Sequence, residues 1–169
     1  PQAGARECLR RLGYQVYRDL EEVPDSGIEV VTLFHVLEHF IEPVETLKGI
    51  KKRMIEGGKI IVEVPHANDF LLSTMRSSSF KAFTLWSEHL ILHTRKSLRI
   101  FLEDAGFKNI TIKGFQRYPL INHIYWLIKA KPGGHVAWKH LRSQTLDQVY
   151  EYFLKSINQT DTLIAIAES

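Results

Sequence analysis

Hydrophobic and polar residues alternate along the chain in a pattern that predicts strands and helices in turn. Residues 28–34 are almost all apolar or β-branched, which is typical of a strand buried on both faces. Residues 43–55 carry apolar side chains at helical spacing, in a helix opened by Pro43 and closed by Gly57–Gly58. A second apolar run follows at residues 59–64. Strand, helix and strand in this order predict a βαβ unit with parallel strands.

The rest of the chain continues this alternation. Helices are predicted at 2–12, 95–105 and 145–156, strands at 14–17, 109–115 and 162–167, and irregular or weakly helical structure at 66–93. Cys8 lies on the apolar stripe of the first helix, which predicts a core position. With neither a repeat nor a linker, residues 1–169 are expected to form a single domain with an aromatic-rich insertion at about 116–142. The predicted fold class is an open α/β sheet.

Composition excludes several classes of protein. At 44% hydrophobic and 11% aromatic residues, the 169-residue chain has enough apolar side chains for a core and is not disordered. Its 22 basic and 19 acidic residues are scattered, so no nucleic-acid partner is expected. No apolar stretch is long enough to predict a membrane span. The single cysteine, Cys8, fits a cytoplasmic location.

Three segments resemble, in order and spacing, class I S-adenosylmethionine-dependent methyltransferases. The run Phe-His-Val-Leu-Glu-His-Phe-Ile-Glu-Pro at 34–43 is similar to a strand-end motif of that family. Residues 54–65 resemble its Gly-Gly turn and following strand, and residues 87–107 resemble its segment from Glu-His to Ala-Gly-Phe. Residues 161–167 resemble its last strand. The resemblance implies a Rossmann-like methyltransferase fold, S-adenosylmethionine as cofactor and a small-molecule acceptor. Oxygen is the default acceptor atom because a candidate histidine base is expected at the cleft.

The family's first βαβ unit has no counterpart in this sequence. In the family a Gly-rich loop and an acid at the end of the second strand hold the cofactor, and neither pattern precedes the first predicted helix. The resemblance therefore implies an N-terminally truncated sheet, and this chain alone is expected to be inactive. The alternative is a non-catalytic α/β module for binding or oligomerisation, in which exposed strand edges pair two copies into a homodimer.

The resemblance also implies roles for residues near the cofactor. Asp19 matches a carboxylate that accepts from the adenine amino group, and Leu20 follows it with a backbone contact and ring packing. Phe34 and His35 stand at the end of a central strand, where the family's cofactor and substrate meet. His35 is the candidate general base, although a solvated turn for Asp19 and a simple cleft position for His35 remain alternatives.

Further polar residues follow the ends of the predicted strands and are expected to border the substrate cleft. His66 and Asn68 come after the second strand, Glu88 and His89 precede a helix as a candidate lid, and Tyr118 begins the aromatic insertion. A polar loop and a separately packed helical flap are the alternatives for these segments.

His35, Glu38 and His39 have the spacing i, i+3 and i+4, which places them on one side of a helical turn. The spacing resembles the E-x-x-E-H triad of quinone-biosynthesis O-methyltransferases, with His35 in place of the first carboxylate. Imidazole suits zinc or iron better than magnesium. No metal is assigned; Glu38 and His39 are kept as candidate ligands, and the alternative is that they bond the following loop.

Overall fold

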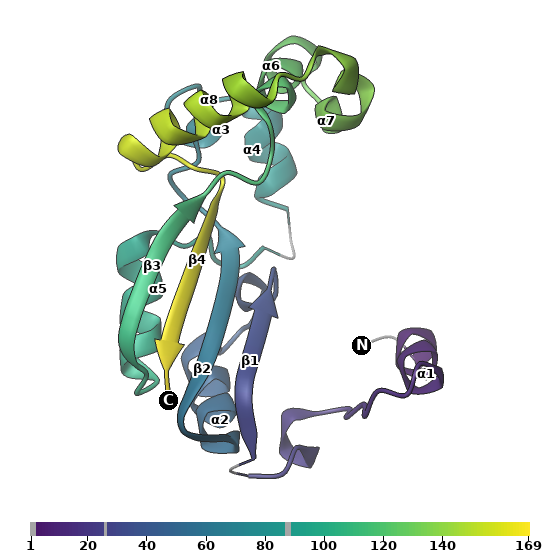
Figure 1. Ribbon diagram of the computed structural model, residues 1–169, viewed down its shortest axis with the longest axis vertical. Helices are drawn as coiled ribbons and strands as arrows, with labels where there is room; N and C mark the ends of the chain where they lie inside the picture. The colour runs from purple at the N-terminus through teal and green to yellow at the C-terminus, as the bar shows by residue number, and fades with distance from the viewer. Residues whose placement is uncertain (1–2, 26, 87–88) are drawn as a thin grey trace.

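The computed structural model describes residues 3–25, 27–86 and 89–169. At its centre is a four-stranded sheet, shown in Figure 1, with the strand order β1-β2-β4-β3. The strands are β1 (Ile28–Phe34), β2 (Met54–Pro65), β3 (Lys108–Phe115) and β4 (Thr162–Glu168). Strand β1 pairs with β2 in parallel, and β4 is antiparallel to both of its neighbours. The predicted open α/β sheet and its parallel βαβ unit are confirmed.

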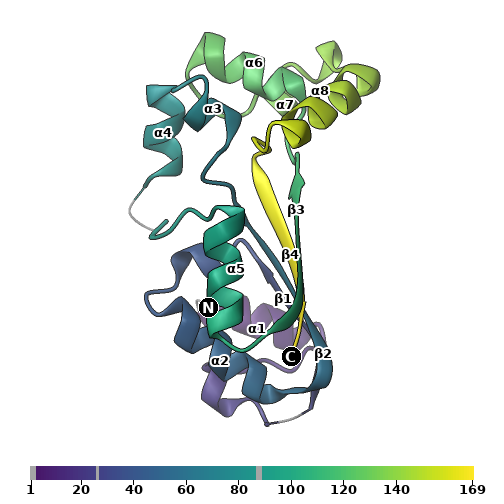
Figure 2. The ribbon, with the colours of Figure 1, turned by 90° about the vertical axis from the view of Figure 1, so that its left-hand side faces the viewer.

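One face of the sheet is covered by two helices, α2 (Pro43–Arg53) and α5 (Arg95–Asp104). Figure 2 shows both on the same side of the strands. The buried aliphatic side chains alternate along the strands and recur at helical spacing in the helices, so they meet in a single layer. The core of this layer includes Leu47, Ile50, Ile60, Val62, Val64, Leu98, Leu102, Leu163 and Ala165. Burial of this apolar area is the main stabilising contribution to the sheet.

The opposite face of the sheet is open. Val30 and Phe34 on β1 expose 55% and 54% of their surface, and Ile166 on β4 exposes 43%. Within residues 3–25, 27–86 and 89–169, no strand pairs with the outer edge of β1. The predicted strand at 14–17 is wrong, because this extended segment has no neighbouring strand with which to form a ladder.

The first helix, α1 (Ala3–Arg11), confirms the helix predicted at 2–12, but it stands apart from the sheet in Figure 1. Cys8 is therefore exposed, and the prediction of a core position for it is wrong. The connection from α1 reaches the short helix η1 (Leu20–Glu22), which packs beside α2. Arg53, the last residue of α2, is buried there and donates to the carbonyl oxygens of Leu20 and Gly49.

The Gly57–Gly58 pair lies inside β2 rather than between helix and strand. Helix α2 ends at Arg53, two residues earlier than predicted, and β2 begins at once. Gly57 has a φ of +77°, and a Cβ on Gly58 would lie 3.0 Å from the carbonyl oxygen of Ile55. Only glycine tolerates both conditions, so the pair permits the register shift between β1 and β2 at this point.

A helical cap lies over the carboxyl ends of β1 and β2, at the top of Figures 1 and 2. It consists of α3 (Phe70–Ser73), α4 (Ser78–Thr84), α6 (Leu120–Lys129), α7 (Gly134–Ala137), η3 (Lys139–Leu141) and α8 (Gln144–Ser156). The segment 66–93, predicted as irregular or weakly helical, forms α3 and α4 because Asp69 and Ser77 cap their first turns. The aromatic-rich insertion is largely helical. No helix in the described part of the chain has both the length and the apolarity to cross a membrane.

Candidate functional site

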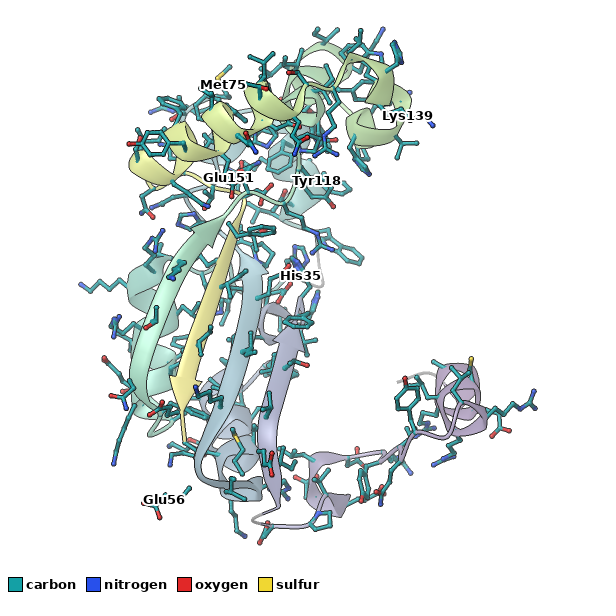
Figure 3. The ribbon with its side chains drawn as sticks, in the orientation of Figure 1. His35, Glu56, Met75, Tyr118, Lys139 and Glu151 are labelled. Carbon is teal, nitrogen blue, oxygen red and sulfur yellow. The ribbon has the colours of Figure 1, made fainter. Side chains whose placement is uncertain are left out.

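The site is centred on His35, which directly follows β1. Figure 3 shows His35 at the junction between the sheet and the cap, with Tyr118 above it. His35 has a φ of +53°, a left-handed conformation that is uncommon outside glycine, and its backbone N–H donates to the Glu63 carbonyl oxygen at 2.9 Å. Such conformations cluster where a side chain must be directed into a site.

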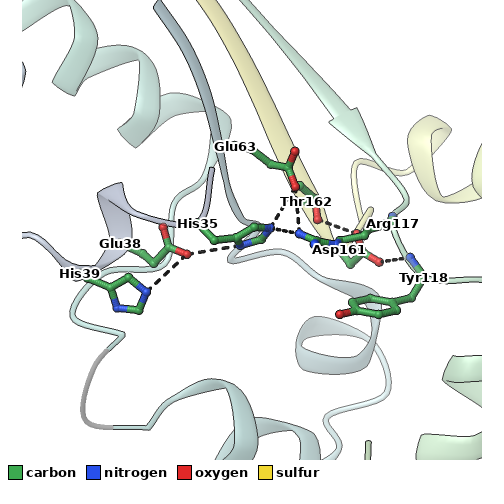
Figure 4. Close-up of polar contacts among 8 residues, drawn as sticks. All are labelled: His35, Glu38, His39, Glu63, Arg117, Tyr118, Asp161 and Thr162. Atoms are coloured by element: carbon green, nitrogen blue, oxygen red, sulfur yellow. Dashed lines mark hydrogen bonds and ion pairs between the residues drawn. The ribbon is translucent and has the colours of Figure 1, made fainter. Parts of the chain in front are cut away.

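Three charged groups surround the His35 imidazole (Figure 4). Its Nε2 lies 2.9 Å from Glu63 Oε1, and its Nδ1 lies 3.4 Å from Glu38 Oε1. Arg117 also contacts Nε2 and forms an ion pair with Glu63 at 3.0 Å. The Glu38 carboxylate, helped by Glu63, raises the pKa of His35 above its usual value, although burial and the Arg117 cation oppose the shift. His35 therefore binds a proton more readily than an isolated imidazole does.

Glu38 is fully buried in the short helix η2 (Leu37–His39). Burial alone would raise the pKa of its carboxyl group, but the adjacent His35 and His39 side chains lower it on balance. Glu38 is thus a buried anion. Its backbone carbonyl accepts from the N–H groups of Leu90 and Ile91, which joins η2 to the segment after α4.

Asp161 fixes the position of the loop that carries Arg117. Its carboxylate accepts from the backbone N–H groups of Arg117 at 2.9 Å and Tyr118 at 3.0 Å, and from the Gln116 side chain at 2.8 Å. Thr162 donates a fourth bond from its hydroxyl group. Burial raises the pKa of Asp161, while these donors lower it. The loop between β3 and α6 is therefore anchored to the start of β4.

A cavity of about 200 Å³ opens between the sheet ends and the cap. Its walls include the aromatic side chains of Phe80, Phe83 and Trp126, which pack against one another with ring centroids 5.1 to 6.5 Å apart. His123 also lines it, and burial lowers the pKa of His123 to about 4, so this imidazole is neutral. A largely apolar cavity with a few directed polar groups is typical of small-molecule sites.

Several residues predicted for the cleft line this cavity. His35, His66, His89 and Tyr118 all lie in its wall. His66 is buried, and its Nδ1 bonds to the Thr160 carbonyl oxygen at 2.9 Å. The carboxyl ends of β1 and β2 thus meet at the cavity, as expected for neighbouring parallel strands.

Other predicted residues lie elsewhere. Asn68 stands outside the lining that the described residues define, and its carbonyl oxygen accepts from Ser73. Glu88 falls outside the described residues. Phe34 precedes His35 on the open face of β1.

The residues predicted to bind adenine are not beside His35. Asp19 is exposed and pairs with Arg18 at 3.5 Å. Leu20 packs against the core from the direction of α2, where Arg53 Nε donates to its carbonyl oxygen at 2.5 Å. The contact with the last turn of α2 places η1 at the amino end of β1, away from the cavity, as Figure 1 shows. Their role in cofactor binding stays a prediction.

Glu63 and Asp161 were missed by sequence reasoning. A signal existed for Glu63, because it is a charged residue within a strand that is otherwise apolar. No comparable signal existed for Asp161, which precedes the last strand and resembles any polar residue at a turn. Its role depends on the position of Arg117, 44 residues away in sequence.

Comparisons with known proteins agree with this architecture. Residues 8–112 match a family described as a methyltransferase domain, which is more than half of the chain. No curated protein matches the chain in sequence.

Solved structures show the same fold. A SAM-dependent methyltransferase from Archaeoglobus fulgidus superposes with a TM-score of 0.55 at 18% identity, over 91% of this chain and 66% of the other. A SAM-dependent methyltransferase of Thermotoga maritima, described as a possible histamine N-methyltransferase, gives 0.61 at 16% identity, over 99% and 70%. The chain thus spans about two thirds of the length of these structures. The likeness establishes a Rossmann-like methyltransferase fold.

Proposed function

We propose, from the premise that this chain belongs to the methyltransferase domain family, that its cavity takes part in methyl transfer from S-adenosylmethionine to an oxygen atom of a small molecule. The observation that carries the proposal is the position of His35. His35 directly follows the carboxyl end of β1, and its imidazole faces the cavity between the carboxylates of Glu38 and Glu63. A hydroxyl group is a weak nucleophile, so a base at this place favours oxygen as the acceptor.

The described residues fit the charged end of this cofactor. S-adenosylmethionine supplies, when bound, a methyl group on a positively charged sulfur. The Glu63 carboxylate and the exposed ring of Phe34 are groups that attract a cation. For the adenosine end, Asp19 and Leu20 do not lie beside these residues, so this chain alone is expected to bind the cofactor weakly.

The two nitrogens of His35 have different roles in this proposal. When the ring is neutral, Nε2 accepts from the Arg117 guanidinium group and Nδ1 carries the proton toward Glu38. Nε2 is then the basic atom, and an acceptor hydroxyl group that displaces the Arg117 N–H from its lone pair gives its proton to it. The resulting Nε2–H donates to Glu63 Oε1, which lies 2.9 Å away. The two carboxylates thus stabilise the protonated ring.

The aromatic side chains that line the cavity contribute to the reaction through their low polarity. Phe80, Phe83 and Trp126 give the cavity an apolar wall, and low polarity in such a wall strengthens the electrostatic contacts of His35. Arg117, fixed through Asp161, orients the Glu63 carboxylate. Positioning and proton transfer are what the protein contributes to a displacement at a methyl carbon.

The test uses a preparation that binds S-adenosylhomocysteine in calorimetry. Transfer of a radiolabelled methyl group to catechol and to benzylamine is compared, as an oxygen and a nitrogen acceptor. We expect transfer to catechol, and a rate about 10²- to 10⁴-fold lower in His35→Ala because the general base is lost. His140→Ala, an exposed histidine of the cap, is the matched control and retains the rate. Transfer to benzylamine alone, or full activity of His35→Ala, contradicts the proposal.

The outer edge of β1, which pairs with no strand among the described residues, favours a second function. Its exposed backbone groups, beside the apolar surface of Val30 and Phe34, are suited to pairing with another strand. We propose that a further strand there completes the cofactor site in the active protein. The alternative is a binding or oligomerisation module in which a second copy supplies the strand. A tight dimer in sedimentation, with no binding of S-adenosylhomocysteine, favours the module.

The remaining partner assignments are also proposals. The scattered charge, +3 overall, supports a small-molecule partner over nucleic acid. The exposed thiol of Cys8 supports a cytoplasmic location, where thiols stay reduced.

A further inference from the structure

Three potential metal ligands converge beside the cavity. Glu38 and His39 come from η2, and His89 comes from the segment after α4. One ligand atom from each lies within 4.8 Å of the others. His39 Nε2 is 3.9 Å from Glu38 Oε1, and the rings of His39 and His89 have centroids 5.0 Å apart. Residues distant in sequence thus direct donor atoms to one point.

Glu38 gives independent evidence for a cation at this point. Its side chain is 0% exposed, and within the described part of the chain neither carboxylate oxygen accepts a well-formed hydrogen bond. Its charged contacts are the longer ion pairs with His35 at 3.4 Å and His39 at 3.9 Å. A buried carboxylate without such partners is costly unless a positive charge compensates it. The nearby imidazoles carry charge only when they are protonated. A bound cation would compensate the charge of Glu38 when both imidazoles are neutral.

His89 is prepared for coordination by its own hydrogen bond. Its Nδ1 lies 2.7 Å from the carbonyl oxygen of Thr84. A carbonyl oxygen can only accept, so Nδ1 carries the proton and the lone pair is left on Nε2. A metal-ligating histidine almost always donates its other ring N–H in this way, which fixes both tautomer and orientation.

We propose that Glu38, His39 and His89 bind one divalent transition-metal ion, with zinc as the preferred metal. Two imidazoles and one carboxylate are a ligand set that zinc uses, and imidazole disfavours magnesium and calcium. Donors around a tetrahedral zinc ion stand about 3.4 Å apart at bond lengths of about 2.1 Å. The ligand atoms of Glu38, His39 and His89 now lie up to 4.8 Å apart. Small rotations of the two partly exposed imidazole rings bring these distances into the range for zinc. Water or another ligand takes the fourth position.

The ion would join two parts of the molecule. It links η2, directly after β1, to the segment that follows α4, and His89 also forms part of the cavity wall. Glu38 also lies 3.4 Å from His35 Nδ1, so the ion would border the site without occupying the cavity. The proposal does not depend on methyl transfer, because the ligands and their readout are independent of the cofactor.

The test is a titration of the chelator-treated protein with Co²⁺, followed by visible absorption and by displacement with Zn²⁺. We expect one equivalent to bind, with the intense bands of a four-coordinate ion. Glu38→Gln and His89→Ala should each weaken binding at least 10-fold, and His140→Ala, an exposed histidine remote from the cluster, should leave it unchanged. Zn²⁺ should raise the melting temperature of the parent protein but not that of His89→Ala.

The contrary results are equally defined. Failure of the parent protein to bind Co²⁺ or Zn²⁺ below about 100 μM overturns the proposal and leaves the ion pairs with the neighbouring imidazoles as the only compensation of Glu38 among the described residues. Binding that survives His89→Ala also overturns it. If Glu38→Gln does not fold, as circular dichroism would show, His89→Ala decides the question, because His89 is only partly buried.

Discussion

The sheet with α2 and α5 and the helical cap are stabilised in different ways. Between the sheet and its two helices the buried side chains are aliphatic, among them Ile60, Leu102 and Leu163. In the cap and at its junction with the sheet, several fully or nearly buried side chains are polar, including His66, Asp69 and His123. We call the sheet with α2 and α5 the aliphatic half and the cap with its junction the polar half, because different interactions stabilise them.

This difference explains why the ligand cavity lies in the polar half of the molecule. Aliphatic packing is non-directional and tolerates water poorly, so it forms a rigid support. The cap buries apolar side chains such as Leu71 and Leu154, and it adds directed contacts. These include the hydrogen bond of 2.7 Å between His123 and Tyr150 and the edge-on contact of Phe80 with Trp126. Directed contacts leave room between them, and the cavity lies among these groups rather than in the aliphatic layer.

The largest expected effect tests the aliphatic half. Leu102→Ala leaves a cavity at a fully buried position and should lower the free energy of unfolding by about 2–5 kcal/mol. Leu127→Ala is the matched control in the cap, where the side chain is 47% exposed, and should change it by less than about 0.5 kcal/mol. Urea denaturation measures both. Equal losses would contradict the view that burial of Leu102 in the aliphatic layer is what stabilises the sheet and its helices.

A second test examines the polar half through pH. Burial, reinforced by the Asp161 carboxylate, raises the pKa of Asp69 to about 7. Between pH 4 and 7 the folded protein therefore holds a proton that the unfolded chain has lost, so stability falls as pH rises through this window. Asp69→Asn keeps the helix cap and removes this dependence.

Above pH 7 Asp69→Asn should be more stable than the parent protein by up to about 4 kcal/mol, and near pH 4 the two should be alike. Thermal unfolding across the pH range measures the difference. A constant offset at all pH values would mean that Asp69 is ionised throughout and that the cap accommodates its charge.

The smallest expected effect concerns the segment outside both halves. Asp19 is exposed and pairs only with Arg18 in the contacts described, so Asp19→Ala should change the free energy of unfolding by less than about 0.5 kcal/mol. Calorimetry with S-adenosylhomocysteine, in a preparation that binds it, sharpens the result. Weaker binding of the variant would show that this segment moves to the cofactor when the site is complete.

Sequence reasoning succeeded where periodicity determines structure. The strand at 28–34 and the helix at 144–156 were predicted to within a residue, because burial on two faces or on one stripe leaves a clear pattern. It failed at 14–17, where an extended segment lacks a partner strand, and at Gly57–Gly58, where a bulge inside β2 resembles a turn. In both cases the outcome depends on a neighbour distant in sequence.

The site was predictable to a similar extent. His35, His66 and His89 were identified from their places after strands or before a helix, and the cavity brings them together. Glu63 and Arg117 complete the charge network only because the cap returns to the end of β2. Spacing along the chain does not reveal such a contact, since it depends on the sheet order.

The position of β4 has a consequence for how the protein folds during synthesis. The last strand in sequence, β4, lies between β2 and β3, so it pairs Lys59 with Glu168 and Phe115 with Thr162. While the ribosome still holds residues 162–168, β2 and β3 have no partner on their facing edges. Local helices such as α2 can form early, but the sheet closes only after release of this segment, and contacts so remote in sequence form slowly. Until then the unpaired strands are open to aggregation and are natural substrates for chaperones.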